Sequence, residues 1–315
     1  MIRWGVLGNA WIARDFMIPA LEKSRNGVLA AIASRSEPPK DLAPTARHYS
    51  SYEALLRDRE IDAVYIPVPN ALHAKWSIEA MRSGKHVLCE KPLVCTAKEA
   101  REIKRVSEET GLYCVEAFMY RLNTKFSLLR KVLKEQDVGR ILGMQAHFGY
   151  LLDWASPARE DRSLGGGCLY DIGCYAVDCM NLLMEEQGAV FEEGSGSFFV
   201  KNGVDYRCAG SLRYSDGTLG SLLCWFTGPG SQTLTLSCER GVITADYPFE
   251  SGGGKVVLSR EEEKTVFETE AGTDPYQLEA EAFADLITGN GAPMITLEES
   301  VTNAVVMDAL LAGRN

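Results

Sequence analysis

A lysine in the segment Cys89-Glu90-Lys91-Pro92 is placed where its ammonium group could stabilise negative charge on a reacting oxygen. The segment ends an apolar run, His86-Val87-Leu88-Cys89, whose bounding glycine and proline are typical of a short, buried parallel strand. In open α/β sheets, ligands bind beyond the carboxyl ends of such strands. Pro92 restricts Lys91 to extended backbone geometry, so its side chain is aimed. The alternative is a surface lysine paired with Glu90.

A carboxylate and a phenol follow three consecutive glycines in the stretch Gly165 to Tyr175. Glycines let the backbone approach another surface closely. If a helix begins near Leu169, Asp171 and Tyr175 are four residues apart and share one helical face. They could then form a proton-transfer pair. The alternative is that Asp171 interacts with the dipole of the first helical turn and Tyr175 packs in the core.

The N-terminus contains a dinucleotide-binding fingerprint. A strand-like run, Ile2 to Leu7, is followed by Gly8-Asn9-Ala10-Trp11-Ile12-Ala13, which opens a helical pattern. This order matches G-x-G-x-x-G/A with alanine at the second glycine position. The helix N-terminus would offer N–H groups and a positive dipole end to a pyrophosphate. The cofactor-binding candidates in this segment are Gly8, Ala10, Trp11 and Ile12.

The end of the second predicted strand favours one cofactor over another. Residues 28–33 are apolar and lead into Ser34-Arg35-Ser36. An NAD-selective site normally has a carboxylate here for the ribose 2′-hydroxyl. Arg35 can instead neutralise a 2′-phosphate and stack on adenine, so Ser34 and Arg35 favour NADP. NAD is the alternative if Glu37 contacts the ribose.

A third loop is expected beside the same ligand. The strand Ala63 to Ile66 ends in Pro67-Val68-Pro69-Asn70-Ala71-Leu72-His73. Pro69 and Asn70 are therefore further cofactor-binding candidates, as is Glu90. Asn70 is also a good N-cap for the following helix. His73 either faces the nicotinamide or simply lies in the first helical turn.

The pattern of elements predicts two domains. Strands and helices alternate up to about residue 121, which predicts a Rossmann domain with a parallel sheet over residues 1–121. Strands dominate from residue 189 to 268, which predicts an α+β domain with a mostly antiparallel sheet over residues 122–315. Two amphipathic helices, residues 276–288 and 297–311, are expected to cover one side of that second sheet.

Composition excludes several function classes. The 315 residues carry a net charge of −10, which argues against non-specific nucleic-acid or anionic-membrane binding. No apolar run approaches the length of a membrane span, and the chain enters a core strand at once, so a cytoplasmic location is expected. The nine cysteines form no C-x-x-C pair, so we expect reduced thiols and no metal site.

These motifs together resemble the Gfo/Idh/MocA oxidoreductases. The resemblance covers nearly the whole chain and includes the segments Gly8 to Ala13, Pro67 to His73, Glu90-Lys91-Pro92, Glu116 to Arg121 and Gly165 to Tyr175. It implies a Rossmann domain followed by an α+β domain with a large, mostly antiparallel open-faced sheet, which often mediates homodimer or homotetramer contacts. It also implies hydride transfer between a nicotinamide and a sugar, polyol or related diol.

The resemblance assigns roles to the candidate residues. Lys91 matches the family's lysine beside the nicotinamide, and Asp171 matches the acidic residue of its substrate site. Tyr175 matches the tyrosine of the branch that contains glucose–fructose oxidoreductase, xylose dehydrogenases and dihydrodiol dehydrogenases. Tyr175 would be the general acid/base, with its ordinary pKa of about 10 lowered by Lys91. Further candidates for substrate contact are Arg121, Trp154 and Arg162. The alternative for each of them is ordinary packing at the surface or at the domain junction.

Two other classes of function remain compatible with the sequence. The first is an NAD(P)-binding regulator or sensor that keeps the fold without catalysis. The second is a structural oligomer, which the nucleotide fingerprint disfavours. The set of Lys91, Asp171 and Tyr175 favours an NAD(P)-dependent enzyme that acts on CH–OH groups.

Overall fold

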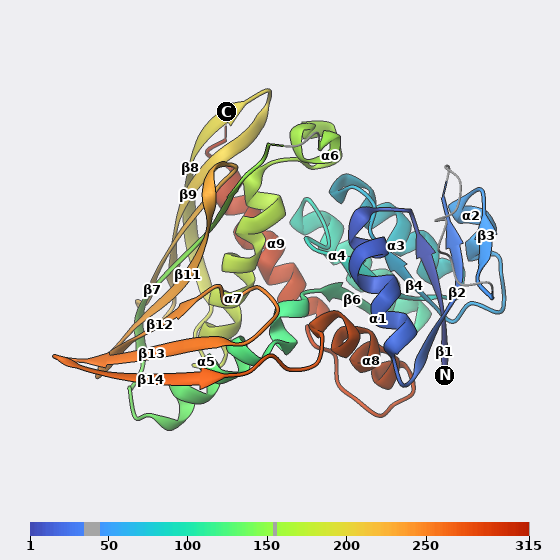
Figure 1. Cartoon of the computed structure of the whole chain (residues 1–315). Helices are drawn as coiled ribbons and strands as arrows, with labels where there is room; N and C mark the ends of the chain where they lie inside the picture. The colour runs from blue at the N-terminus through green and yellow to red at the C-terminus, as the bar shows by residue number, and fades with distance from the viewer. Residues whose placement is uncertain (35–44, 154–155, 315) are drawn as a thin grey trace. The chain divides into compact units, whose positions relative to one another are not determined.

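Six parallel strands form the first sheet of the computed structural model, which describes residues 1–34, 45–153 and 156–314 (Figure 1). The strands are β1 (Ile2–Leu7), β2 (Gly27–Ala33), β3 (Arg47–Tyr49), β4 (Ala63–Ile66), β5 (His86–Glu90) and β6 (Cys114–Ala117). Their order is β3-β2-β1-β4-β5-β6. The strand order reverses between β1 and β4, and ligands bind at such a switch point in dinucleotide-binding folds.

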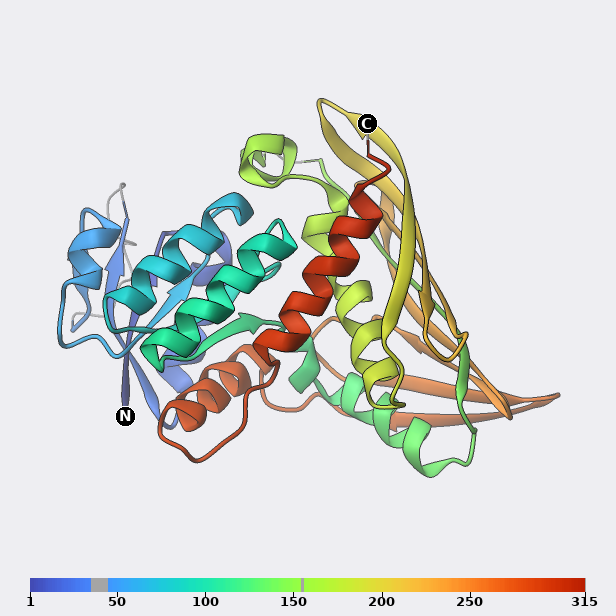
Figure 2. The same cartoon turned by 180° about the vertical axis from the view of Figure 1, so that it is seen from behind.

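Helices cover both faces of this sheet. They are η1 (Ala13–Met17), α1 (Ile18–Lys23), α2 (Tyr52–Leu56), η2 (Asn70–Leu72), α3 (His73–Arg82), α4 (Ala97–Thr110) and α8 (Pro275–Ile287). Helices α1 and α8 lie on one face, and α3 and α4 lie on the other (Figures 1 and 2). Local signals set the ends of α4, because Thr96 accepts a hydrogen bond from the Glu99 N–H and Gly111 adopts a positive φ of 68°.

Eight strands form the second sheet, in the order β14-β13-β12-β11-β7-β10-β9-β8. They are β7 (Ile141–Leu151), β8 (Phe191–Lys201), β9 (Val204–Tyr214), β10 (Leu219–Trp225), β11 (Thr227–Cys238), β12 (Gly241–Asp246), β13 (Gly254–Arg260) and β14 (Glu263–Thr269). Strands β7 and β10 pair in parallel, and the other neighbours are antiparallel. The predicted fold class is confirmed.

Helices pack on one face of the second sheet (Figure 2). Apart from α8, the helical elements that follow β6 are η3 (Met119–Leu122), α5 (Thr124–Glu135), α6 (Pro157–Glu160), η4 (Arg162–Leu164), η5 (Leu169–Gly173), α7 (Cys174–Glu185) and α9 (Leu297–Leu311). Helix α5 contacts β12, β13 and β14, and α7 contacts β7 and β10. Within the described ranges, no helix is both long and apolar enough to span a bilayer.

The chain divides into two compact units, and helix α8 belongs to the first. That unit comprises Met1–Met119 with Thr273–Ser300, and the second comprises Tyr120–Gly272 with Val301–Asn315. The prediction that the helix near residues 276–288 covers the second sheet is therefore wrong.

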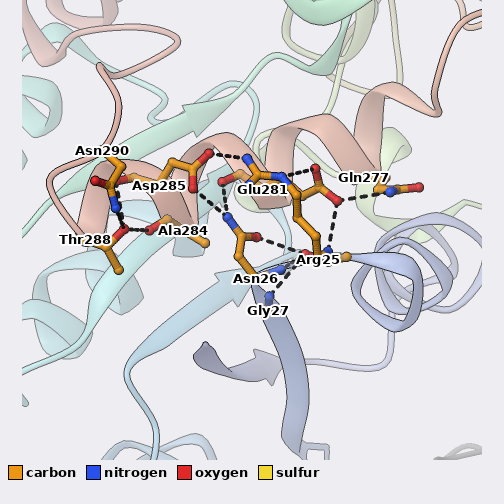
Figure 3. Close-up of polar contacts among 10 residues, drawn as sticks. Arg25, Asn26, Gly27, Gln277, Glu281, Ala284, Asp285, Thr288 and Asn290 are labelled. Carbon is orange, nitrogen blue, oxygen red and sulfur yellow. Dashed lines mark hydrogen bonds and ion pairs between the residues drawn. The ribbon is translucent and has the colours of Figure 1, made fainter.

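Polar contacts explain where α8 packs (Figure 3). The Arg25 Nε donates to Glu281 Oε2 at 3.1 Å, and Arg25 also pairs with Asp285. The Asn26 amide donates to Asp285 Oδ1 at 2.8 Å. Since Arg25 and Asn26 immediately precede β2, the acidic side of α8 is fixed beside the amino end of β2 in the parallel sheet.

Candidate active site

The predicted cofactor-binding loops follow neighbouring strands of the first sheet. Gly8 follows β1, Ser34 follows β2, Asn70 follows β4 and Lys91 follows β5. These four strands are consecutive in the order β2-β1-β4-β5, and all are parallel. Parallel strands end at the same edge of a sheet, so the fold brings these loops together at the switch point.

The turn after β1 requires glycine. Gly8 has a φ of +120°, and its N–H donates to the Ala33 carbonyl at 2.8 Å. A Cβ at this position would lie 3.2 Å from the Tyr52 hydroxyl. The helical path begins directly after the turn, since the Ala13 N–H donates to the Ala10 carbonyl at 3.1 Å. The chain thus forms the tight strand-to-helix turn that the fingerprint predicts.

The candidate residues after β1 and after β2 differ in exposure. Trp11 is 46% exposed and packs edge-on against Phe16, with ring centroids 5.6 Å apart, while Ile12 is half-buried. Ser34 is buried, and its hydroxyl lies 3.1 Å from His48 Nε2. Arg35, predicted to bind a 2′-phosphate, lies outside the described residues. His48 was not predicted as a site residue, and no spacing signal indicated it.

Buried polar groups hold the loop that carries Lys91. Glu90 Oε1 accepts a hydrogen bond from the hydroxyl of Tyr65, a fully buried residue of β4. The Leu93 N–H donates to Glu116 Oε1 at 2.8 Å. Lys91 itself is half-buried, and the Lys91–Pro92 peptide bond is cis. Contacts on both sides therefore fix the backbone of Lys91 at the carboxyl end of β5.

His73 joins this loop to the loop after β4. It is fully buried in the first turn of α3, with Nδ1 2.7 Å from the Pro92 carbonyl and Nε2 2.7 Å from the Val68 carbonyl. Burial, helped by the charge of Lys91 and opposed by the two carbonyl contacts, lowers the pKa of His73 to about 4. A neutral imidazole has one N–H, so it donates to one carbonyl at a time.

The predicted N-cap role of Asn70 is wrong. Asn70 begins the 3₁₀ turn η2, whose N-cap is Pro69, and helix α3 has Leu72 as its N-cap without a side-chain capping bond. The chain makes a 3₁₀ turn before the α-helix starts, so Leu72 rather than Asn70 is the residue at the N-cap of α3. Pro69 and Asn70 nevertheless lie at the expected sheet edge.

In the second unit, Asp171 and Tyr175 share one face of a helical segment. Both are half-buried, whereas all the remaining residues from 165 to 181 are buried. The segment starts as the π-helical turn η5 and continues as α7. Gly167, which precedes it, has a φ of +121°, and a Cβ there would lie 2.2 Å from Asp205 Oδ1. The predicted close approach of the glycine loop to another surface is confirmed.

Asp171 is held by two residues that no motif or spacing in the sequence had indicated. Its Oδ2 accepts hydrogen bonds from the Tyr150 hydroxyl at 2.6 Å and from Arg159 Nε at 3.0 Å. Burial raises the pKa of Tyr150, and the charge of Asp171 raises it further, so Tyr150 stays protonated and donates. Tyr150 lies on β7 and Arg159 on α6. The two donors stabilise Asp171 as a carboxylate and fix its orientation.

Tyr175 lies in a cluster of aromatic rings. Its ring centroid is 5.8 Å from that of Tyr120 and 5.6 Å from those of Phe148 and Phe249. The cluster combines η3, β7, α7 and the segment after β12. It therefore restricts the Tyr175 ring from three directions.

The three further candidates for substrate contact differ in their surroundings. The Arg121 guanidinium donates to both oxygens of buried Asp178, at 2.9 Å from Nε and 2.6 Å from Nη2. This pairing favours the packing interpretation for Arg121. Arg162 is exposed on η4. Trp154 lies outside the described residues.

A parallel sheet with this strand order, followed by a large open-faced sheet, defines the class of two-domain Rossmann oxidoreductases. Residues 2–118 match the model of an oxidoreductase family with an NAD-binding Rossmann fold, and residues 126–244 match the GFO/IDH/MocA C-terminal domain. The chain belongs to the GFO/IDH/MocA oxidoreductase family. The predicted family is therefore confirmed.

Relatives of known activity align along nearly the full chain. The chain is 34% identical to D-xylose 1-dehydrogenase (NADP(+)) 2 of Haloferax volcanii, covering 98% of this chain and 95% of the relative. It is 28% identical to 1,5-anhydro-D-fructose reductase of Ensifer adhaerens, covering 100% and 98%. The crystal structure of KijD10, a 3-ketoreductase from Actinomadura kijaniata in complex with NADP and TDP-benzene, superimposes with a TM-score of 0.90 at 28% identity, covering 99% and 97%.

Proposed function

We propose that this protein is an NADP-dependent oxidoreductase that transfers a hydride between the nicotinamide and a secondary alcohol or carbonyl carbon of a sugar, polyol or related diol. The observation that carries the proposal is the partial exposure of Asp171 and Tyr175 in a segment, residues 165–181, whose other residues are buried. A carboxylate fixed by two donors and a phenol fixed by aromatic rings suit binding and proton exchange at a substrate hydroxyl. Relatives named as sugar dehydrogenases and reductases support the substrate class.

The first unit fits the proposed cofactor. Gly8 makes its turn with a φ of +120° and leads directly into a helical segment, the strand-to-helix arrangement of a pyrophosphate site. At the end of β2, the Ser34 hydroxyl lies 3.1 Å from His48 Nε2, and a hydroxyl and an imidazole N–H are both groups that can donate hydrogen bonds to a ribose 2′-phosphate. When bound, NADP supplies C4 of the nicotinamide as the hydride acceptor or donor.

The protein's own residues carry the remaining chemistry. Tyr175 takes the proton from the substrate hydroxyl during oxidation and returns it during reduction. Lys91, at the carboxyl end of β5, offers an ammonium group that can stabilise negative charge on a reacting oxygen. Asp171 accepts a hydrogen bond from the substrate and orients it, because Tyr150 and Arg159 hold its carboxylate in place. Lys91 thus acts through its charge, and Tyr175 moves the proton.

A substrate panel tests this proposal directly. Reduced-nicotinamide absorbance should change with NADP and at least one aldose, polyol or diol, with D-xylose as the first compound because of the Haloferax relative. The Lys91→Met variant should lose turnover while it keeps NADP binding, measured by quenching of Trp11 fluorescence. Lys255→Met is the matched control, since Lys255 is an exposed residue that pairs with Glu268. Near-normal turnover by Lys91→Met would contradict the role assigned to Lys91.

The uncovered face of the second sheet supports a homo-oligomer, which we include in the proposal. Register places exposed apolar side chains on the face opposite α5 and α7, among them Phe199, Leu219, Leu223, Val242 and Val266. An apolar surface spread over one face is typical of an interface. Light scattering should give a dimer or tetramer for wild type and a smaller species for Leu223→Lys. Val190→Lys, exposed but outside the strands, is the control. A monomeric wild type contradicts this part.

A further inference from the structure

Arg314, near the C-terminus, forms a buried ion pair with Asp205 of β9. Its Nη1 lies 2.6 Å from Asp205 Oδ1, and the two side chains are 10% and 0% exposed. The Arg314 N–H donates to the Leu311 carbonyl at 2.9 Å, which ties the last residues to the end of α9. The guanidinium also lies over the Tyr170 ring, 5.8 Å from its centroid. These contacts hold Arg314 in one place.

The second oxygen of Asp205 holds the start of the segment that carries Asp171. Asp205 Oδ2 accepts a hydrogen bond from the Leu169 N–H at 2.7 Å, and Leu169 is the first residue of η5. The Cys168 thiol lies 3.4 Å from the same oxygen. The carboxylate also presses against Gly167, where a side chain would collide with it. Asp205 therefore links the C-terminus to the first turn of the segment that contains Asp171 and Tyr175.

Electrostatics make this link depend on both partners. A carboxylate without solvent exposure needs a partner, because an unpaired buried charge is strongly destabilising. Loss of Arg314 would leave the buried Asp205 carboxylate without its charged partner, and the carboxylate would have to move toward other donors. This movement weakens its bond to the Leu169 N–H. The effect reaches Asp171 two residues later, at the carboxylate that Tyr150 and Arg159 hold.

We propose that Arg314 is a positioning residue for the reaction, acting through Asp205 to fix η5 and hence Asp171 and Tyr175. This inference rests on the proposed function of those two residues. It makes the C-terminal residues part of the substrate side of the enzyme. The cofactor residues belong to the first unit, so cofactor binding is not expected to depend on Arg314.

Steady-state kinetics and hydrogen exchange test the proposal in the full-length chain. Arg314→Ala should lower kcat about 10- to 100-fold, since a displacement of about 1 Å in a reacting group can cost a factor of that size. The KM for NADP should stay within twofold of wild type, and the amides of Leu169–Gly173 should exchange faster. Arg240→Ala is the control, because Arg240 forms exposed ion pairs with Asp137 and Glu239.

Each outcome supports or overturns the proposal. Normal kcat in Arg314→Ala, or unchanged exchange at Leu169–Gly173, overturns it, and an equal loss of kcat in Arg240→Ala does the same. If Arg314→Ala fails to fold, Arg314→Lys carries the test, with a smaller loss of kcat expected at unchanged KM for NADP and normal kcat overturning it. If wild type turns over no sugar or diol, the proposed function fails, and the exchange measurement alone decides whether Arg314 fixes η5.

Discussion

Replacing Tyr175 by phenylalanine removes one hydroxyl group and leaves the aromatic ring. The ring contacts with Tyr120, Phe148 and Phe249, at centroid distances of 5.6–5.8 Å, do not involve the hydroxyl. The free energy of unfolding should therefore fall by no more than about 1.5 kcal/mol, the net contribution of one hydrogen bond. The variant thus separates chemistry from packing.

The catalytic effect of Tyr175→Phe should be much larger. A positioned general acid/base contributes about 10²- to 10⁴-fold to rate, which corresponds to about 2.7–5.4 kcal/mol of activation free energy. We expect kcat to fall by a factor within that range, measured by reduced-nicotinamide absorbance with the best substrate of the panel. The KM for NADP should stay near wild type, because Tyr175 lies outside the unit that contains the cofactor residues.

Tyr247→Phe is the matched control, since Tyr247 is a 42% exposed tyrosine of the same unit. Its kcat should equal that of wild type. A Tyr175→Phe enzyme with kcat within threefold of wild type and an unchanged pH–rate profile would refute the role of Tyr175 as the acid/base. A large drop in melting temperature would instead assign the loss of activity to packing.

Three further changes test the framework of the site. Asp178→Asn should lower the free energy of unfolding by about 3–5 kcal/mol in denaturant titration, because it leaves the buried Arg121 guanidinium without its charged partner; a loss below 1 kcal/mol would contradict this. Gly167→Ala should cost at least about 1–3 kcal/mol, because φ is +121° and the new Cβ meets the Asp205 carboxylate; an unchanged melting temperature would show that this loop can relax. Burial raises the pKa of Glu279 well above its ordinary value, and nearby acidic charges add to the shift, so the folded protein keeps a proton that the unfolded chain releases above about pH 4. Stability should therefore fall as pH rises through this range, and Glu279→Gln should gain melting temperature relative to wild type from acid to neutral pH; a pH-independent difference argues against a protonated Glu279.

The sequence determined the elements whose signals are local. Strand β4 and helix α9 have the predicted bounds. A capping box starts α9, with the Glu299 N–H donating to Thr296 Oγ1 at 3.2 Å and the Thr296 N–H donating to Glu299 Oε2 at 2.7 Å. Caps and periodicity act over three or four residues, so the order of residues along the chain specifies them.

The sequence also placed the candidate cofactor-binding loops, because alternating strands and helices permit few topologies. Once β1, β4 and β5 are parallel neighbours, their ends meet at one edge, and Gly8, Asn70 and Lys91 follow. The same reasoning put Asp171 and Tyr175 on one face of a helix, because four residues make about one turn.

Only the tertiary structure decided which partners hold these residues. Asp171 pairs with Arg159 and Tyr150, and Asp205 pairs with Arg314 across 109 positions of sequence. Helix α8 packs on the first sheet rather than the second, through Arg25 and its acidic partners. A buried charge needs a partner in space, but no rule of spacing says where in the chain that partner lies. Packing of distant segments makes that choice, and it fixed the environment of the site that sequence alone could only locate.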